Sequence, residues 1–118
     1  MYIYCMKASL NNYRQAPRKV RLITELIKGK SAVQAQGILT HLIKKGALPM
    51  KKLLDSAVAN AGVPADTLMI KTATVDKGVV IKRWMPRAMG RAFPIHKHTS
   101  KVFIELAPVS PKKLAPKV

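Results

Sequence analysis

One stretch of the sequence concentrates side chains that bind anions. Between Asp76 and Glu105 there is no acidic residue, whereas the basic residues there are Lys77, Lys82, Arg83, Arg87, Arg91, Lys97 and Lys101. The aromatic residues Trp84 and Phe93 lie among these basic residues. Arginine forks match phosphate oxygens in bidentate geometry, and aromatic rings stack on unpaired bases. This combination predicts binding to RNA.

The same stretch has the pattern of a long β-hairpin. Residues 79–85 read as an ascending strand, Pro86 and Gly90 as turn residues, and residues 93–98 as a returning strand. Arms of about nine residues would extend roughly 30 Å. Because a two-stranded ribbon is marginally stable alone in water, an external surface such as RNA is expected to hold it. The alternative is a solvated basic loop with Trp84 in the core.

A second basic cluster precedes the first acidic residue, Glu25. It consists of Arg14, Arg18, Lys19 and Arg21, at or just before the start of a predicted helix. The helix dipole disfavours cations at this end, so their clustering indicates an external anion that the free backbone N–H groups also bind. A solvated charged face is the alternative.

Composition narrows the class of protein. The 118 residues include 22 Lys and Arg but only 5 Asp and Glu, a formal charge of +17, which points to a polyanionic partner. An apolar content of 48% argues against a disordered basic tail. Cys5 is the single cysteine, which excludes an intramolecular disulfide and fits a reducing compartment. With no long apolar run and no signal-peptide pattern, we expect a soluble intracellular protein.

Hydrophobic periodicity predicts helices followed by strands. Helices are expected at 17–28, from a Ser31 cap to about 42, and at 49–61; strands are expected at 2–10, 68–75 and 101–106, with a turn at Asn11-Asn12. This order favours an antiparallel α+β fold in one domain, residues 1–107, which includes the hairpin at about 79–98. The tail, residues 108–118, is rich in Pro and Lys and is predicted to be extended and mobile.

Two other classes of function were weighed. His96 and His98 would share one face of a strand and begin a metal site with Cys5 or His41, but no sharply spaced ligand pair supports it. The five acids are scattered singly, so we expect no enzyme, no metal and no cofactor. A free nucleic-acid-binding regulator is the main alternative, with Gly46 in the turn of a helix-turn-helix.

Several separated motifs resemble one known family. They are Pro17–Leu22, Leu26–Lys30, Ser56–Ala61, Lys82-Arg83, Pro86–Ala92 and Lys97–Ser100. Over about residues 7–107 they resemble the large-subunit ribosomal protein family numbered twenty-two, in its bacterial form. The resemblance implies three helices packed on a three-stranded antiparallel sheet, with a long protruding hairpin. It also implies a structural constituent of the large ribosomal subunit that binds its rRNA and supports early assembly.

The resemblance also implies partners and contact residues. The partners are large-subunit rRNA, neighbouring large-subunit proteins and the nascent peptide at the exit-tunnel wall, in a cytoplasmic or organellar ribosome, with no membrane and no small-molecule substrate. The residues expected to contact rRNA are Arg14, Arg18, Lys19, Arg21, Lys82, Arg83, Trp84, Arg87, Arg91, Lys97, His98 and Lys101. The tunnel-wall tip is expected at Met85, Pro86, Arg87, Ala88, Met89, Gly90 and Arg91.

Five positions depart from the family pattern, two of which, Lys101 and Val79, change only local detail. Ala16 stands where many members have a capping Ser, which is expected to cost the first helix about 1 kcal/mol. Met89 occupies a position that is often Lys or Arg, and His98 replaces a frequent Arg. The contacts of the tip are therefore less closely defined by the resemblance than those of the arms.

Overall fold

The chain folds into helices and antiparallel strands, as predicted. The computed structural model describes residues 6–109. In chain order the elements are β1 (Lys7–Tyr13), α1 (Pro17–Ile27), α2 (Ala32–His41), α3 (Ala47–Ala61), β2 (Leu68–Lys77), β3 (Ile81–Pro86), β4 (Ala92–Lys97) and β5 (Ser100–Pro108). Single 3-10 turns lie at Ala65–Thr67 and Ala88–Gly90. The α+β fold class is confirmed.

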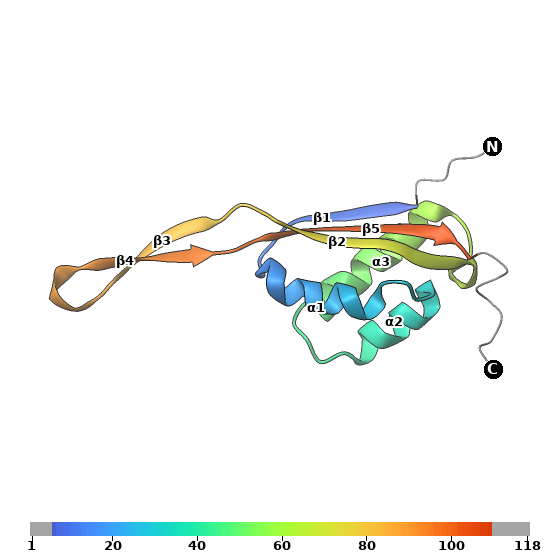
Figure 1. The fold of residues 1–118 in the computed structure, drawn as a ribbon, viewed down its shortest axis with the longest axis horizontal. Coiled ribbons are helices and arrows are strands. Elements are labelled where there is room, and N and C mark those ends of the chain that lie inside the picture. The colour runs from blue at the N-terminus through green and yellow to red at the C-terminus, as the bar shows by residue number, and fades with distance from the viewer. Residues whose placement is uncertain (1–5, 110–118) are drawn as a thin grey trace.

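The body of the molecule has two layers. One layer is an antiparallel sheet in the order β1-β5-β2, and α1, α2 and α3 all lie against the same side of it (Figure 1). On the central strand, Val102, Ile104 and Leu106 alternate with more exposed residues and are almost fully buried under the helices. This alternation is the period of two expected for a strand with one buried face. The core is therefore the space between the sheet and the helices.

Two β-bulges set which side chains reach that core. In β1 the pairing with β5 shifts between Leu10 and Tyr13, where Asn12 has a positive φ of 56°. The prediction of a turn at Asn11-Asn12 is therefore wrong, because the bulge absorbs the irregularity and the strand continues. Among the described residues β1 begins at Lys7, and the first part of the strand predicted at 2–10, residues 2–5, lies outside them. In β2 a second shift between Ile70 and Thr72 changes the alternation, so that Ala73 and Val75 face the core in place of Thr72 and Thr74.

The helix boundaries follow from local signals. α1 starts at Pro17 and ends at Ile27, one residue before the predicted end, with Gly29 at φ 78° just beyond it. The Ser31 side chain accepts a hydrogen bond from the Gln34 N–H, which confirms the predicted cap of α2. α3 begins two residues earlier than predicted and ends at Gly62, whose φ of 68° terminates the helix.

The start of α1 allows a test of how much an N-cap side chain stabilises the protein. Ala16 is the N-cap residue, with extended backbone and no side-chain hydrogen bond. We expect Ala16→Ser to raise the free energy of unfolding by about 1 kcal/mol, because the hydroxyl would accept from a free N–H of the first turn. Urea titration followed by circular dichroism measures the change. Ser31→Ala is the opposite control and should lower stability by a similar amount; no gain from Ala16→Ser would show that solvent already satisfies these N–H groups.

The second sheet is a hairpin that projects from the body. β3 and β4 pair from Ile81↔Lys97 to Pro86↔Ala92, and the described molecule measures 66 × 34 × 18 Å (Figure 1). The paired arms have six residues each, fewer than the nine predicted, because residues next to the body join the two sheets without pairing in the hairpin. Trp84 is 70% exposed, which contradicts the alternative of Trp84 in the core.

The C-terminal boundary differs from the prediction at its first residue. Pro108 was assigned to a mobile tail, but it is the last residue of β5 and pairs with Leu68. The Val109 N–H donates to the Thr67 carbonyl oxygen at 2.8 Å. The rest of the predicted tail, residues 110–118, lies outside the described residues. Within residues 6–109 no helix has the length and apolar character needed to cross a membrane.

Candidate nucleic-acid interface

Both faces of the hairpin carry a cation and an exposed ring. Residues paired across antiparallel strands share a face. One face therefore holds Lys82 with His96 and, beside them, Trp84 with Pro94. The opposite face holds, in the same way, the pairs Arg83↔Ile95 and Met85↔Phe93. Trp84 and Phe93 are 70% and 50% exposed, so each face offers a stacking surface next to a positive charge.

The positive charges of the hairpin are not neutralised by the protein. Throughout residues 6–109 the ion pairs are those of Glu105 with Lys7, at 3.8 Å, and with Lys71, at 3.9 Å, both on the body sheet. On the hairpin, Arg83 Nη1 donates to the carbonyl oxygen of Lys82 at 2.9 Å, a contact that leaves the charge in place. These cations are therefore available to an external anion.

The tip of the hairpin is a tight turn with two arginines at its base. The Arg87 N–H donates to the Arg91 carbonyl oxygen at 2.7 Å, which places the two residues opposite each other. Between them, Met89 has a φ of 63° and is 95% exposed, and Gly90 has a φ of 68°. A left-handed conformation costs a non-glycine residue roughly 1–2 kcal/mol. The turn thus presents Met89 at the far end of the molecule at some cost in stability.

The hairpin is joined to the body at a short segment that we call the joint, residues 78–80 and 98–100. The Gly78 N–H donates to the Thr99 carbonyl oxygen at 2.9 Å, and the Thr99 hydroxyl donates to the Val79 carbonyl oxygen. Thr99 and Ser100 are 2% and 0% exposed. Gly78 packs so closely that an added Cβ would lie 3.2 Å from the backbone carbon and oxygen of Thr99. The joint is therefore built from backbone contacts that exclude a side chain.

Polar groups near the joint are incompletely satisfied. The Tyr13 hydroxyl, Gln15 Oε1 and Ser100 Oγ are buried and have no hydrogen-bond partner within the described residues. Tyr13 pairs with Ser100 across β1 and β5, so two of these atoms belong to neighbouring residues. Burial also raises the pKa of the Tyr13 hydroxyl. Buried polar side-chain atoms therefore gather at the end of the body from which the hairpin leaves.

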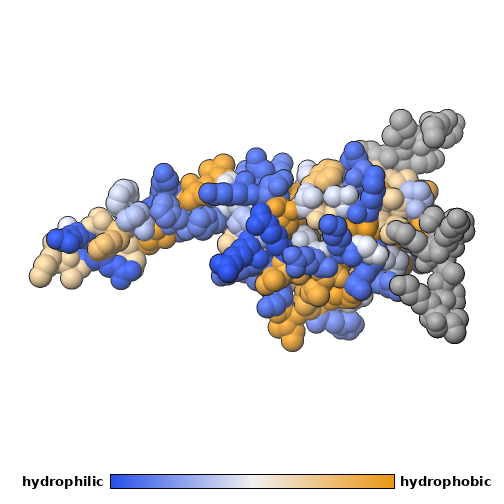
Figure 2. Space-filling model, viewed as in Figure 1, coloured by the Kyte–Doolittle hydropathy of each residue, from blue (hydrophilic) through white to orange (hydrophobic). Residues whose placement is uncertain are grey.

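A basic groove lies where the hairpin leaves the body. It has a volume of about 540 Å³ and is lined by Arg14, Gln15, Ala16, Lys19, Lys45, His96, Lys97 and His98. None of these residues is acidic, and strongly hydrophilic side chains gather at this part of the surface (Figure 2). The start of α1 also points toward the hairpin, so the positive end of the helix dipole adds to the positive potential there (Figure 1).

Close packing brings Lys45 to this groove. Lys45 belongs to the loop between α2 and α3, far in sequence from α1. The next residue, Gly46, sits against the body so tightly that an added Cβ would lie 2.7 Å from Ile23 Cδ1 and 3.0 Å from Gln15 Oε1. The absent side chain lets the loop approach the start of α1. The position of Lys45 in the groove therefore depends on the small size of its uncharged neighbour, Gly46.

The structure separates the sequence-predicted contact residues into three groups. The hairpin carries Lys82, Arg83, Trp84, Arg87 and Arg91 together with the predicted tip, Met85, Pro86, Ala88, Met89 and Gly90. The groove brings together Arg14, Lys19, Lys97 and His98. The remaining three, Arg18, Arg21 and Lys101, line neither site.

Arg21 and Lys101 have contacts or neighbours within the body. Arg21 Nε and Nη2 donate to the Val75 carbonyl oxygen at 3.3 and 3.1 Å. Because β2 is an edge strand, this guanidinium satisfies a carbonyl that no other strand reaches. Lys101 lies opposite Asp76 in the pairing of β2 with β5. Sequence reasoning identified both as cations but had no signal for these neighbours.

Two titratable residues of the groove, Lys45 and His96, are absent from the predicted contact set. Lys45 gave no local signal, because only the packing of Gly46 brings it to α1. His96 was considered only as a metal ligand with His98; the centroids of the two rings are 6.4 Å apart. No group of three or more His, Cys, Asp or Glu residues within 6–109 is arranged to hold a metal ion, and Cys5 lies outside that range.

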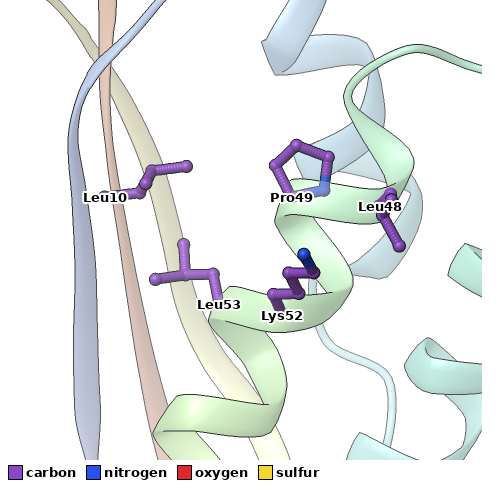
Figure 3. A pocket seen from close by; sticks show the side chains of 5 residues that line it. All are labelled: Leu10, Leu48, Pro49, Lys52 and Leu53. Carbon is purple, nitrogen blue, oxygen red and sulfur yellow. The ribbon is translucent and has the colours of Figure 1, made fainter.

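A separate hollow lies between β1 and α3 and is apolar. Its volume is about 410 Å³ and its lining is Leu10, Leu48, Pro49, Lys52 and Leu53 (Figure 3). Its one charged side chain is Lys52, and no carboxylate, imidazole, thiol or hydroxyl group accompanies that amine in the lining.

α3 does not have the arrangement of a recognition helix. Its face with Leu53, Leu54 and Ala57 is buried against the core. On its exposed side, Asn60 Nδ2 donates to the Lys7 carbonyl oxygen at 3.0 Å and Asp55 accepts from Gln36 at 2.7 Å. Side chains already engaged in this way are poorly placed to read bases, which disfavours the helix-turn-helix alternative.

Comparisons with known proteins agree with this basic architecture. The family model described as ribosomal protein L22p/L17e matches residues 8–107. Among curated relatives, large ribosomal subunit protein uL22 of Anaeromyxobacter sp. (strain Fw109-5) is 47% identical over 104 residues, covering 84% of this chain and 72% of that protein. The protein of the same name from Myxococcus xanthus is 46% identical over 106 residues, covering 85% and 93%. That of Mesoplasma florum is 48% identical over 102 residues, covering 83% and 91%.

Proposed function

Because the chain belongs to the ribosomal protein L22p/L17e family, we propose that it is a structural, non-catalytic component of the large ribosomal subunit and binds its rRNA. Its curated relatives carry the name of a large-subunit protein, and their similarity extends over the body and the hairpin. The proposed location is accordingly the ribosome, in the cytoplasm. Neighbouring large-subunit proteins are the further partners.

The observation that carries this proposal is the exposed, acid-free hairpin. Every residue of β4 and all of β3 except Ile81 are exposed, so the hairpin buries no face of its own in the body. A ribbon of this kind gains stability only against another surface. Its unpaired cations and exposed rings match the phosphates and unstacked bases of folded RNA. An rRNA environment would supply both requirements at once.

The finer assignment concerns the ends of the hairpin. The arms and the basic groove would contact rRNA, and the tip from Met85 to Arg91 would line the nascent-peptide exit tunnel. The length of the molecule, 66 Å along its longest axis, supports a tip that lies far from the RNA bound by the body. A component that bridges separate RNA segments in this way would also favour early subunit assembly.

Sedimentation of a cell lysate through a sucrose gradient tests the proposal. With the protein followed by immunoblot, we expect it in the large-subunit peak at near-physiological salt and still there at about 0.5 M salt. Simple counterion-release binding weakens by orders of magnitude over such a range, whereas an embedded component is retained. Protein that runs free, or leaves the particle as salt rises, would replace the structural role with that of a nucleic-acid-binding regulator.

A further inference from the structure

The basic groove has walls on two parts of the molecule. Arg14, Lys19 and Lys45 belong to the body, whereas Lys97 and His98 belong to the returning arm and the joint. No acidic side chain lines either wall, so cations face cations across the hollow. An arrangement of like charges is unfavourable until an anion lies between them.

We propose that a stretch of RNA backbone with neighbouring phosphates binds in this groove and thereby fixes the orientation of the hairpin relative to the body. This inference rests on the proposed function, because it assigns a specific ligand group and a mechanical consequence to one part of the rRNA interface. The occupant is recognised by its phosphates, since cationic side chains stand on both walls, whereas the rings in the lining are the imidazoles of His96 and His98, on the hairpin side alone.

The mechanical consequence follows from how weakly the hairpin is otherwise held. The joint supplies the Gly78 and Thr99 hydrogen bonds, while β3 and β4 are exposed along their length. The polar atoms of Gln15 and Ser100 near it are buried without a partner within residues 6–109. The joint thus sets the mean direction of the hairpin, while the exposed arms beyond it, which have few packed contacts, can still move about that direction. A phosphate bound to both walls would favour the one orientation in which the walls face each other.

Trp84 provides a built-in probe of this motion. It is the only tryptophan of the chain, it is 70% exposed on β3, and it does not line the groove. Time-resolved fluorescence anisotropy of the full-length protein would report nanosecond motion of the hairpin separately from overall tumbling. The titrant is inorganic tripolyphosphate in about 0.15 M KCl, because it contains phosphates but no base that could stack on Trp84.

A pair of charge-matched variants isolates the groove. Lys45→Gln with Lys97→Gln removes one cation from each wall, whereas Lys30→Gln with Lys52→Gln removes two exposed cations elsewhere on the body. We expect tripolyphosphate to reduce the amplitude of hairpin motion in the wild type and in the control variant with dissociation constants within twofold. The groove variant should bind at least tenfold more weakly. Circular dichroism would show whether this variant is folded. If it is not, Arg14→Gln with Lys19→Gln serves as a second groove variant.

Two results would overturn the inference. Equal weakening in the groove and control variants would mean that the anion binds the diffuse positive charge. Saturable, groove-dependent binding with unchanged hairpin motion would mean that the groove does not control orientation. Gradient sedimentation of the wild type and the same variants separates the two proposals. Wild-type protein that enters the large subunit while the anisotropy shows no groove effect refutes only this inference. Wild-type protein that never enters the subunit refutes the proposed function.

Discussion

Replacing four hairpin cations by glutamine is expected to lower affinity for large-subunit rRNA about a hundredfold while leaving the body folded. The variant combines Lys82→Gln, Arg83→Gln, Arg87→Gln and Arg91→Gln, all at exposed positions. Four lost phosphate contacts at roughly 0.7 kcal/mol each give a loss of this size at about 0.15 M salt. The dependence of log affinity on log salt should also become shallower by roughly 3, since four fewer counterions are released from single-stranded RNA. Filter binding to an rRNA fragment over a salt series measures both.

A second set of four lysines is the matched control. In this control, glutamine replaces Lys28, Lys30, Lys51 and Lys52. The net charge falls by the same amount as in the hairpin variant, but only residues of the body are changed. If both variants lost affinity equally, the hairpin would contribute only diffuse charge. The free energy of unfolding of the hairpin variant should stay within about 0.5 kcal/mol of the wild type, because these side chains are outside the core. Loss of cooperative melting in the hairpin variant would contradict the architecture in which the hairpin projects from an independently stable body.

The second large effect is expected at Gly78, where the hairpin leaves the sheet. In Gly78→Ala the new Cβ would lie 2.5 Å from the Thr99 hydroxyl oxygen and 3.2 Å from its carbonyl, so the buried joint must shift. Overpacking of this kind costs about 1–3 kcal/mol, and displacement of the hydroxyl that bonds to Val79 adds to it. We expect a fall of about 2–3 kcal/mol in the free energy of unfolding, measured by urea titration, together with weaker rRNA binding from a redirected hairpin.

Gly37→Ala is the same substitution at another position, and we expect it to raise the free energy of unfolding instead of lowering it. Gly37 lies within α2 and an added Cβ would meet nothing within 4 Å. Alanine in place of glycine inside a helix should therefore raise stability by about 0.5–1 kcal/mol. If Gly78→Ala were as well tolerated as Gly37→Ala, the joint would be adaptable, and the close backbone contact with Thr99 would not define the direction of the hairpin.

Local patterns in the sequence were sufficient for most of the elements. The apolar period and Pro17 predict α1, Ser31 predicts the start of α2, and Gly62 predicts the end of α3. Each of these signals acts through neighbours within one or two turns, so no knowledge of the rest of the fold is needed. The hairpin is predicted for the same reason, since its turn residues and its acid-free charge pattern are continuous in the chain.

Features that depend on contacts between distant segments were not predictable. The bulge at Asn12 continues a strand through a sequence that reads as a turn, because pairing with β5 outweighs the local preference. Arg21 reads as a free cation at a helix start, but the neighbouring edge strand presents the Val75 carbonyl oxygen to it. The paired arms are shorter than predicted because residues 79–80 and 98 join the two sheets without pairing in the hairpin.

The sequence alone thus establishes the total charge, the apolar faces of the helices and the position of the basic segment without acidic residues, because these are properties of composition and of short-range spacing. Only the tertiary structure decides that Arg14, Lys45 and Lys97 share one groove while Lys101 lies elsewhere. That convergence depends on the close approach of the Gly46 loop to α1 and on the direction of the hairpin at the joint. Both arise from packing between residues far apart in the chain, which periodicity and residue type do not encode.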